Sequence, residues 1–289
     1  MSDEIKVGTT INSKYELLAV LGKGRNSTVY KGYQHFAKKS VALKILDASD
    51  IEKATEELKR FQHEARVSAQ LAAHQGIVDV FDFGAAGAGQ VFLVMNLIEG
   101  LTLRELISQK GRLDAALASD IFKQIANALA FVHEQKIIHL GLDPSEIILT
   151  PASSKDKETY KVTVVDFGSA VQLSEVKTAI TTPQESSGKP GYMSPEQQSG
   201  EDVDARSDIY TVGRMMYETL TGSLPESVLT FPADLQIPEN IQEAIAKSTD
   251  ADKNKRFQSM KEFAQKLQGS DGPDDKKKDV WGWTKKIFK

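Results

Sequence analysis

The spacing of apolar residues changes near residues 96–100, and this change constrains the fold more than any other feature of the chain. Upstream, the alternating residues 15–21 and the apolar residues 91–95 predict strands, with one helical stretch between them. Downstream, apolar residues recur at helical spacing, as in residues 121–132. The sequence therefore predicts an α+β chain that is β-rich at its beginning and largely helical afterwards.

The composition is that of an ordinary globular protein. A chain of 289 residues with 40% apolar and 26% charged side chains can bury a large core, as one bilobal domain or as two smaller ones. It has no cysteine, which excludes disulfides and thiolate metal sites. A net charge of −4 without a basic stripe argues against nucleic acid as a partner. The N-terminus lacks the apolar run of a signal peptide, so we expect a cytoplasmic protein.

Two features of the β-rich part point to a phosphate site. Gly22 and Gly24 lie between two predicted strands, which is a weak signal by itself. Lys44 lies in the middle of an apolar strand, where an ammonium is costly unless a carboxylate or a phosphate pairs with it. Glu64, beside the apolar stripe of the next helix, is a candidate carboxylate. The alternatives are an edge-strand lysine and a helix glutamate that both reach water.

The order of these and later motifs resembles the bacterial eukaryotic-like (Hanks-type) Ser/Thr protein kinase family. The resemblance is carried by Gly22-x-Gly24-x-x-Ser27-x-Val29, Val41-Ala42-Leu43-Lys44, Glu64, His139, Asp166-Phe167-Gly168, Ser194-Pro195-Glu196, Asp208 and Arg256. It implies a bilobal protein-kinase fold over residues 13–268, after an N-terminal extension of residues 1–12. The implied parts are a β-rich N-lobe with one helix (13–95), a hinge (96–100) and a larger helical C-lobe (101–268).

The resemblance also implies a site for ATP or ADP with Mg²⁺. In this family the counterpart of Lys44 holds phosphates, the counterpart of Glu64 orients that lysine, and the counterpart of Asp166 binds the metal. The residues implied to bind the nucleotide are Gly22, Gly24, Val29, Ala42, Lys44, Met95 and Ile148. By the same resemblance Glu196 and Arg256 form a buried pair, and Asp208 holds the catalytic loop. The alternative is that Lys44, Glu64 and Asp166 only brace the two lobes.

The catalytic loop departs from the family at the position of its catalytic base. The family's His-Arg-Asp is His139-Leu140-Gly141 here, so no carboxylate accepts the proton of a substrate hydroxyl. An uncharged Leu140 also cannot gather a phosphorylated activation loop. We therefore assign no catalytic residue to this chain, with Gly141 at the base position.

Three further substitutions surround that position. Asp143 replaces the lysine that steadies the transferred phosphate, which reverses a charge beside a polyanion. Glu146 replaces the asparagine that holds a second Mg²⁺, and can still supply a metal oxygen beside Asp166. Lys189 stands where relatives have a threonine. Because Asp143 and Lys189 are complementary in charge, we expect an ion pair that locks the activation loop to the catalytic loop. The alternative is two unrelated surface charges.

These features predict a pseudokinase, which acts as a scaffold or an allosteric regulator of a partner protein and can bind nucleotide. One alternative is a weakly active Ser/Thr kinase with a rearranged site, since phosphoryl transfer depends chiefly on positioning. Another is an interaction module that binds no nucleotide.

The last segment, residues 269–289, predicts a flexible linker followed by a basic aromatic tail. Lysines there alternate with large apolar side chains, namely Val280, Trp281, Trp283, Ile287 and Phe288. Such a tail suits a protein partner or weak peripheral membrane contact. The alternative is packing against the chain's own C-lobe.

Overall fold

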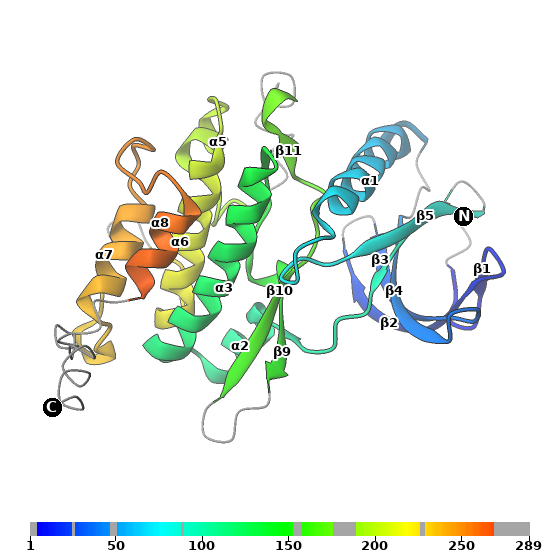
Figure 1. Cartoon of the computed structure of the whole chain (residues 1–289), viewed down its shortest axis with the longest axis horizontal. Helices are drawn as coiled ribbons and strands as arrows, with labels where there is room; N and C mark the ends of the chain where they lie inside the picture. The colour runs from blue at the N-terminus through cyan, green and yellow to red at the C-terminus, as the bar shows by residue number, and fades with distance from the viewer. Residues whose placement is uncertain are drawn as a thin grey trace, which may run out of the picture.

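The structure is a computed structural model, and it describes residues 5–24, 27–46, 51–87, 90–152, 158–175, 189–225 and 229–268. Its N-terminal lobe is a curled antiparallel sheet of strand order β1-β2-β3-β4-β6-β5, covered by helix α1 (Ile51–Leu71) (Figure 1). The strands are β1 (Thr10–Ile11), β2 (Tyr15–Lys23), β3 (Ser27–Gln34), β4 (Lys39–Leu46), β5 (Val80–Gly87) and β6 (Gln90–Asn96). The predicted bilobal α+β fold is thereby confirmed in its first half.

The N-terminal boundary of the folded domain lies earlier than the sequence predicted. Residues 1–12 were expected to be an extension, yet β1 pairs with β2, and Ile11 is 2% exposed in the N-lobe core. Asn12 and Ser13 have φ of 48° and 54°, which makes the tight reversal between the two strands. A two-residue strand shows no hydrophobic period, so the pattern could not reveal it.

The C-terminal lobe is built around α3 (Ala115–Glu134) and α6 (Ala205–Thr221) (Figure 1). Its other helices are α2 (Leu103–Lys110), α5 (Pro195–Ser199), α7 (Glu239–Ser248) and α8 (Met260–Leu267), with the 3₁₀ turns η1 (Pro144–Glu146), η2 (Leu173–Glu175) and η3 (Ala233–Leu235). By length and composition α3 could cross a membrane, but 61% of its apolar window is buried within the fold. Its apolar face therefore forms the core of this lobe.

Two small sheets lie where the lobes meet. One has the order β10-β9-β7, from β7 (Leu101–Thr102), β9 (Ile147–Ala152) and β10 (Thr159–Val164). The other pairs β8 (Ile137–Ile138) with β11 (Val171–Gln172). The register of β9 with β10 sets Ile147 opposite Val164, both fully buried. This pairing brings the loop after β8 beside the turn after β10.

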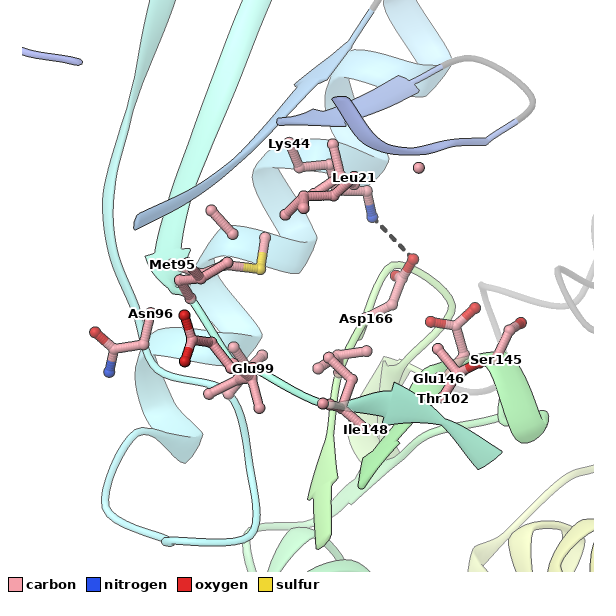
Figure 2. Close-up of a pocket in the computed structure, with 18 of the residues that line it drawn as sticks. Leu21, Lys44, Met95, Asn96, Glu99, Thr102, Ser145, Glu146, Ile148 and Asp166 are labelled. Carbon is pink, nitrogen blue, oxygen red and sulfur yellow. Dashed lines mark hydrogen bonds and ion pairs between the residues drawn. The ribbon is translucent and has the colours of Figure 1, made fainter. Parts of the chain in front are cut away.

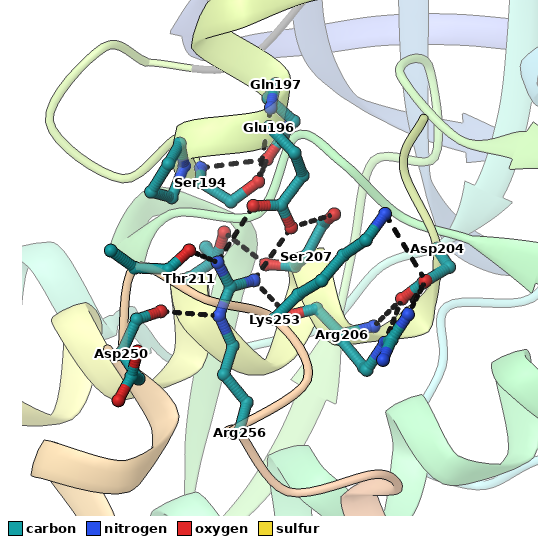
Figure 3. A network of polar contacts seen from close by, with 12 residues as sticks. Ser194, Glu196, Gln197, Asp204, Arg206, Ser207, Thr211, Asp250, Lys253 and Arg256 are labelled. Atoms are coloured by element: carbon teal, nitrogen blue, oxygen red, sulfur yellow. Dashed lines mark hydrogen bonds and ion pairs between the residues drawn. The ribbon is translucent and has the colours of Figure 1, made fainter. Parts of the chain in front are cut away.

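A buried polar network fixes the loops of the C-lobe (Figure 3). Arg256, only 1% exposed, donates to both carboxylate oxygens of Glu196 at 2.7 and 2.8 Å. Asp208, near the start of α6, accepts the backbone N–H groups of His139 and Leu140, each at 2.9 Å. Leu140 has φ of 58°, a conformation that non-glycine residues rarely adopt without such support. The network therefore holds the loop that carries Gly141 and Asp143.

Candidate nucleotide site

A cavity of about 610 Å³ opens between the two lobes. Its walls come from β2, β3 and β4 on one side and from β9 and the turn after β10 on the other. Its lining includes the apolar residues Val29, Ala42, Met95 and Ile148 and the polar residues Ser145, Glu146 and Asp166. Figure 2 shows Met95 and Asn96 at one end, Ser145 and Glu146 at the other, and Lys44 with Asp166 between them. The end with Met95, which Asn96 and Glu99 also line, is called the apolar end, and the end with Ser145 and Glu146 the charged end. A cavity that combines apolar and charged walls suits an amphipathic ligand.

Lys44 joins the two lobes at the middle of this cavity. Its ammonium donates to both oxygens of Glu64 at 2.8 and 2.9 Å and to Asp166 at 2.9 Å. Burial alone would lower the pKa of Lys44, but the Glu64 and Asp166 carboxylates raise it above its ordinary value. β4 supplies the lysine and α1 the glutamate, so the predicted supporting pair needs the packing of α1 on the sheet.

Two carboxylates share this one ammonium, and their pKa values move in opposite directions. Burial and the charge of Asp166 raise the pKa of Glu64 to about 7. For Asp166, burial is opposed and outweighed by Lys44 and by the Gly168 N–H, which lower its pKa. Asp166 is therefore the carboxylate that stays ionised beside Lys44, and Glu64 is the one that takes up a proton as the pH falls through about 7.

The turn after β10 aims Asp166 into the cavity. Asp166 has φ of 62°, and its Oδ1 accepts the Gly168 N–H at 2.9 Å. A Cβ on Gly168 would lie 3.2 Å from a Glu64 oxygen, so glycine leaves the carboxylates room. Phe167 is fully buried, with its ring centroid 4.8 Å from that of His139. His139 is also fully buried, and neither ring nitrogen has a partner among the described residues.

The catalytic loop holds a carboxylate, but not at the position of the family's base. Asp143 Oδ1 accepts the backbone N–H of Ser145 at 2.8 Å and its hydroxyl at 2.6 Å. Asp143 Oδ2 lies 2.7 Å from Lys189 Nζ, and Lys189 also donates to Ser145 Oγ at 2.8 Å. The Asp143 side chain is 3% exposed and the Lys189 side chain 56% exposed. This is the pairing that their opposite charges predict, and its role as a lock stays a prediction.

Glu146 and Asp166 are the side chains that could hold a divalent metal. Both line the charged end of the cavity. Burial, together with the Asp166 and Asp143 carboxylates, raises the pKa of Glu146 well above its ordinary value, which a cation would oppose. The described residues contain no group of three or more metal-ligating side chains. A pair of carboxylates suits Mg²⁺, which takes its remaining ligands from water and phosphate oxygens.

Most of the residues that the sequence assigned to nucleotide binding line this cavity. Gly22, Val29, Ala42, Lys44, Met95 and Ile148 do so. Gly24 does not line it, because it closes the turn of the β2–β3 hairpin by donating its N–H to Ser27 O at 2.7 Å. Other lining residues have no ligand role predicted from the sequence, namely Leu21, Lys31, Val78, residues 96–100, Thr102, Glu105, Ser145 and Val165. The only sequence feature that could have indicated their place in the cavity is that they adjoin recognised motifs or belong to the hinge of residues 96–100. The tail residues 280–288 lie outside the described residues.

Comparison with known proteins gives one family. The family model described as protein kinase domain matches residues 15–272. Serine/threonine-protein kinase PrkC of Bacillus subtilis is 30% identical over 273 residues, covering 89% of this chain and 40% of its own length. A probable serine/threonine-protein kinase of Clostridium acetobutylicum is 33% identical, covering 86% of this chain and 36% of its own length. Serine/threonine-protein kinase PknB of Mycobacterium tuberculosis is 34% identical, covering 74% of this chain and 33% of its own length. The chain therefore spans well under half the length of these relatives.

Proposed function

The chain belongs to the protein kinase domain family, and we propose that it is a nucleotide-binding pseudokinase. In this proposal it binds ATP or ADP, transfers phosphate slowly or not at all, and acts on a partner protein through its conformation. The observation that carries the proposal is the engagement of Asp143. The catalytic-loop position of the base is Gly141, and the carboxylate two residues later is already bound to Ser145 and Lys189.

Nucleotide binding is supported by the shape and charge of the cleft. An adenine ring suits the apolar end near Ala42 and Ile148, and phosphates suit the ammonium of Lys44. The lysine is held in place by Glu64 and Asp166 before any ligand arrives, so little ordering remains to oppose binding. An interaction module that binds no nucleotide would be favoured by a cleft filled with side chains, and the open cavity gives it no such support.

Impaired transfer is supported by what the chain's own groups can do. Lys44 would orient phosphates, and Asp166 with Glu146 would hold Mg²⁺, which supplies charge neutralisation when bound. A substrate hydroxyl must also lose a proton, and a positioned base contributes about 10²–10⁴-fold to the rate. Asp143 could take that proton only after Ser145 and Lys189 release it. The rate of transfer should therefore be low.

A weakly active Ser/Thr kinase is the second candidate. The relatives are named as serine/threonine-protein kinases, and their names favour this candidate more directly than the first. The joined side chains of Lys44, Glu64 and Asp166 support it as well, because they form the phosphate-holding part of a kinase. In this reading Asp143 becomes the base once the Lys189 contact opens.

One pair of measurements tests both candidates. Thermal unfolding is followed with ATP or ADP, with and without Mg²⁺, because a ligand of the native state must raise the melting temperature. Transfer of radiolabelled phosphate from ATP to a Ser/Thr peptide is measured in parallel, with Lys44→Ala as the control for contaminating kinases. A melting shift without transfer supports the pseudokinase. A shift with transfer that Lys44→Ala abolishes supports the weak kinase, and no shift at millimolar nucleotide rejects nucleotide binding.

The partner and the location of the protein are further proposals. We propose a protein partner that contacts the tail residues Trp281 and Trp283, because tryptophan is enriched at the energetic centres of interfaces. Weak peripheral membrane contact through the same tail is the competing proposal. A cytoplasmic location and the lack of a nucleic-acid partner rest on composition and charge alone.

A further inference from the structure

Charges follow a fixed order along the cleft. From the apolar end, Lys44 comes first, with its ammonium on Asp166, and Glu146 and Ser145 lie beyond it (Figure 2). The other lysine among the described lining residues is Lys31, which lies on β3 opposite Ala42 of β4. A nucleotide with its base at the apolar end therefore extends its phosphates past Lys44 toward carboxylates.

Asp143 adds a further negative charge behind this end of the cleft. It lies against Ser145, which lines the cavity, through contacts to the Ser145 hydroxyl and N–H. The Asp143 and Asp166 carboxylates both act on Glu146, whose pKa they raise together with burial. The far end of the cleft is thus crowded with acidic groups.

Lys189 offsets one of these charges. Its ammonium binds Asp143 and Ser145 together, and it reaches them from the segment that precedes α5. The pair Asp143–Lys189 has no net charge, so Lys189 offers no free cation to a phosphate that extends beyond Lys44, whose ammonium is itself shared by Glu64 and Asp166. Without a metal ion, each phosphate placed there meets repulsion.

We propose that the cleft selects a nucleoside diphosphate over a triphosphate when no divalent metal is present, with Asp143 and Lys189 as the specificity-determining residues. This inference rests on the proposed nucleotide binding and adds the class of ligand. Two phosphates can end at Lys44, whereas a third adds negative charge among Glu146, Asp166 and Asp143. Mg²⁺ bound at Glu146 and Asp166 would reduce the preference for the diphosphate, because it would neutralise these two carboxylates.

The test is calorimetric titration of the purified chain with adenosine, ADP and ATP in EDTA. The wild type is expected to bind ADP about tenfold more tightly than ATP, the size of effect that one unscreened neighbouring charge gives. Asp143→Asn removes a negative charge and frees the Lys189 ammonium, so it is expected to raise ATP affinity and abolish the preference. Lys189→Ala leaves Asp143 uncompensated and is expected to widen the preference. Adenosine binding stays constant throughout.

The control is Glu243→Gln, which removes a carboxylate from an exposed pair with Lys266 and should leave the ADP-to-ATP ratio unchanged. Wild-type ATP affinity equal to or above that of ADP overturns the inference, and so does an unchanged ratio in Asp143→Asn. If Asp143→Asn does not fold, the Lys189→Ala variant replaces it as the test. The Lys189 side chain is 56% exposed, so this variant should fold. An unchanged ADP-to-ATP affinity ratio in Lys189→Ala also overturns the inference. Failure of all three ligands to bind rejects nucleotide binding itself, whereas ADP and ATP binding with equal affinity rejects only the preference.

Discussion

The guanidinium of Arg256 and the carboxylate of Glu196 form a two-pronged ion pair inside the C-lobe, at 2.7 and 2.8 Å (Figure 3). Glu196 lies in α5 and Arg256 follows α7, so the pair fastens two segments that are distant in sequence. Arg256 also donates to the backbone oxygens of Asp250, Ala251 and Arg206. Every donor of this buried cation is directed at an oxygen, which makes the pair a fixed part of the lobe.

Removing Glu196 should destabilise the domain strongly. In Glu196→Ala the Arg256 cation stays buried without its partner, and breaking a buried pair in this way costs about 3–5 kcal/mol. The free energy of unfolding in urea measures the loss. The matched control is Glu243→Ala, from a pair with Lys266 whose side chains are 55% and 38% exposed, where we expect a loss under about 1 kcal/mol. Equal losses in the two variants would contradict the structural role of the buried pair.

The stability of the domain should depend on the titration of Glu64. The pKa of Glu64 is raised to about 7 by burial and by Asp166, so the native state holds this proton more tightly than the unfolded chain. Its contribution to stability is complete below the ordinary glutamate pKa and is lost as the pH rises through about 7. Glu64→Gln cannot titrate. Between pH 4.5 and 7.5 the unfolding free energy of the wild type should therefore fall, relative to that of Glu64→Gln, by about 1–3 kcal/mol. A flat difference would show that the pKa of Glu64 is not raised.

Much of the fold was predictable because its elements are long enough to show a period. The strand around Lys44 and the helix around residues 121–132 each repeat their apolar positions several times. The first strand, Thr10–Ile11, was not predicted because two residues are too few to show a hydrophobic period. Its existence depends on the reversal at Asn12 and Ser13, a backbone property that side-chain pattern does not encode.

The candidate site was predictable at Lys44 and Glu64 because a charge there sits in or beside an apolar pattern, and at Asp166 through the family resemblance. The contribution of residues 96–100 could not be predicted, because this connector lines the cleft through its position and not through its residue types. Ser145 was also missed, because its place in the cleft depends on the hydrogen bonds that it donates to Asp143 and accepts from Lys189. The bond from Lys189 joins segments more than forty residues apart, which only the folded chain brings together.

Deletion of residues 279–289 tests the proposed role of the tail. We expect the shortened chain to keep its melting temperature and nucleotide shift but to lose capture of a specific partner from lysate. Trp281→Ala with Trp283→Ala should reproduce the loss, since tryptophan anchors carry much of the energy of an interface. Sedimentation with anionic and neutral liposomes is the parallel measurement. Loss of liposome binding with intact capture favours the membrane proposal, and no change in either measurement rejects both.

Restoring the substituted positions together should raise phosphate transfer far more than restoring one. The described glycines with positive φ are Gly8, Gly111, Gly200 and Gly222, so an aspartate at position 141 meets no backbone strain. Gly141→Asp alone returns a base, yet the Asp143–Lys189 pair remains and offers no cation to the transferred phosphate. We therefore expect a small gain, under about tenfold, because catalytic groups that act as a unit are not additive.

The triple variant Gly141→Asp, Asp143→Lys, Lys189→Thr returns the base, the phosphate-facing lysine and the neutral contact between the loops. We expect its rate of transfer to a Ser/Thr peptide to exceed that of the wild type by about 100-fold or more, since a base contributes about 10²–10⁴-fold once the groups that act with it are in place. Adding Lys44→Ala to the triple variant should abolish the gain, which excludes contaminating enzymes. A wild-type rate as high as that of the triple variant would mean that Asp143 already serves as the base, and the weak-kinase reading would replace the pseudokinase.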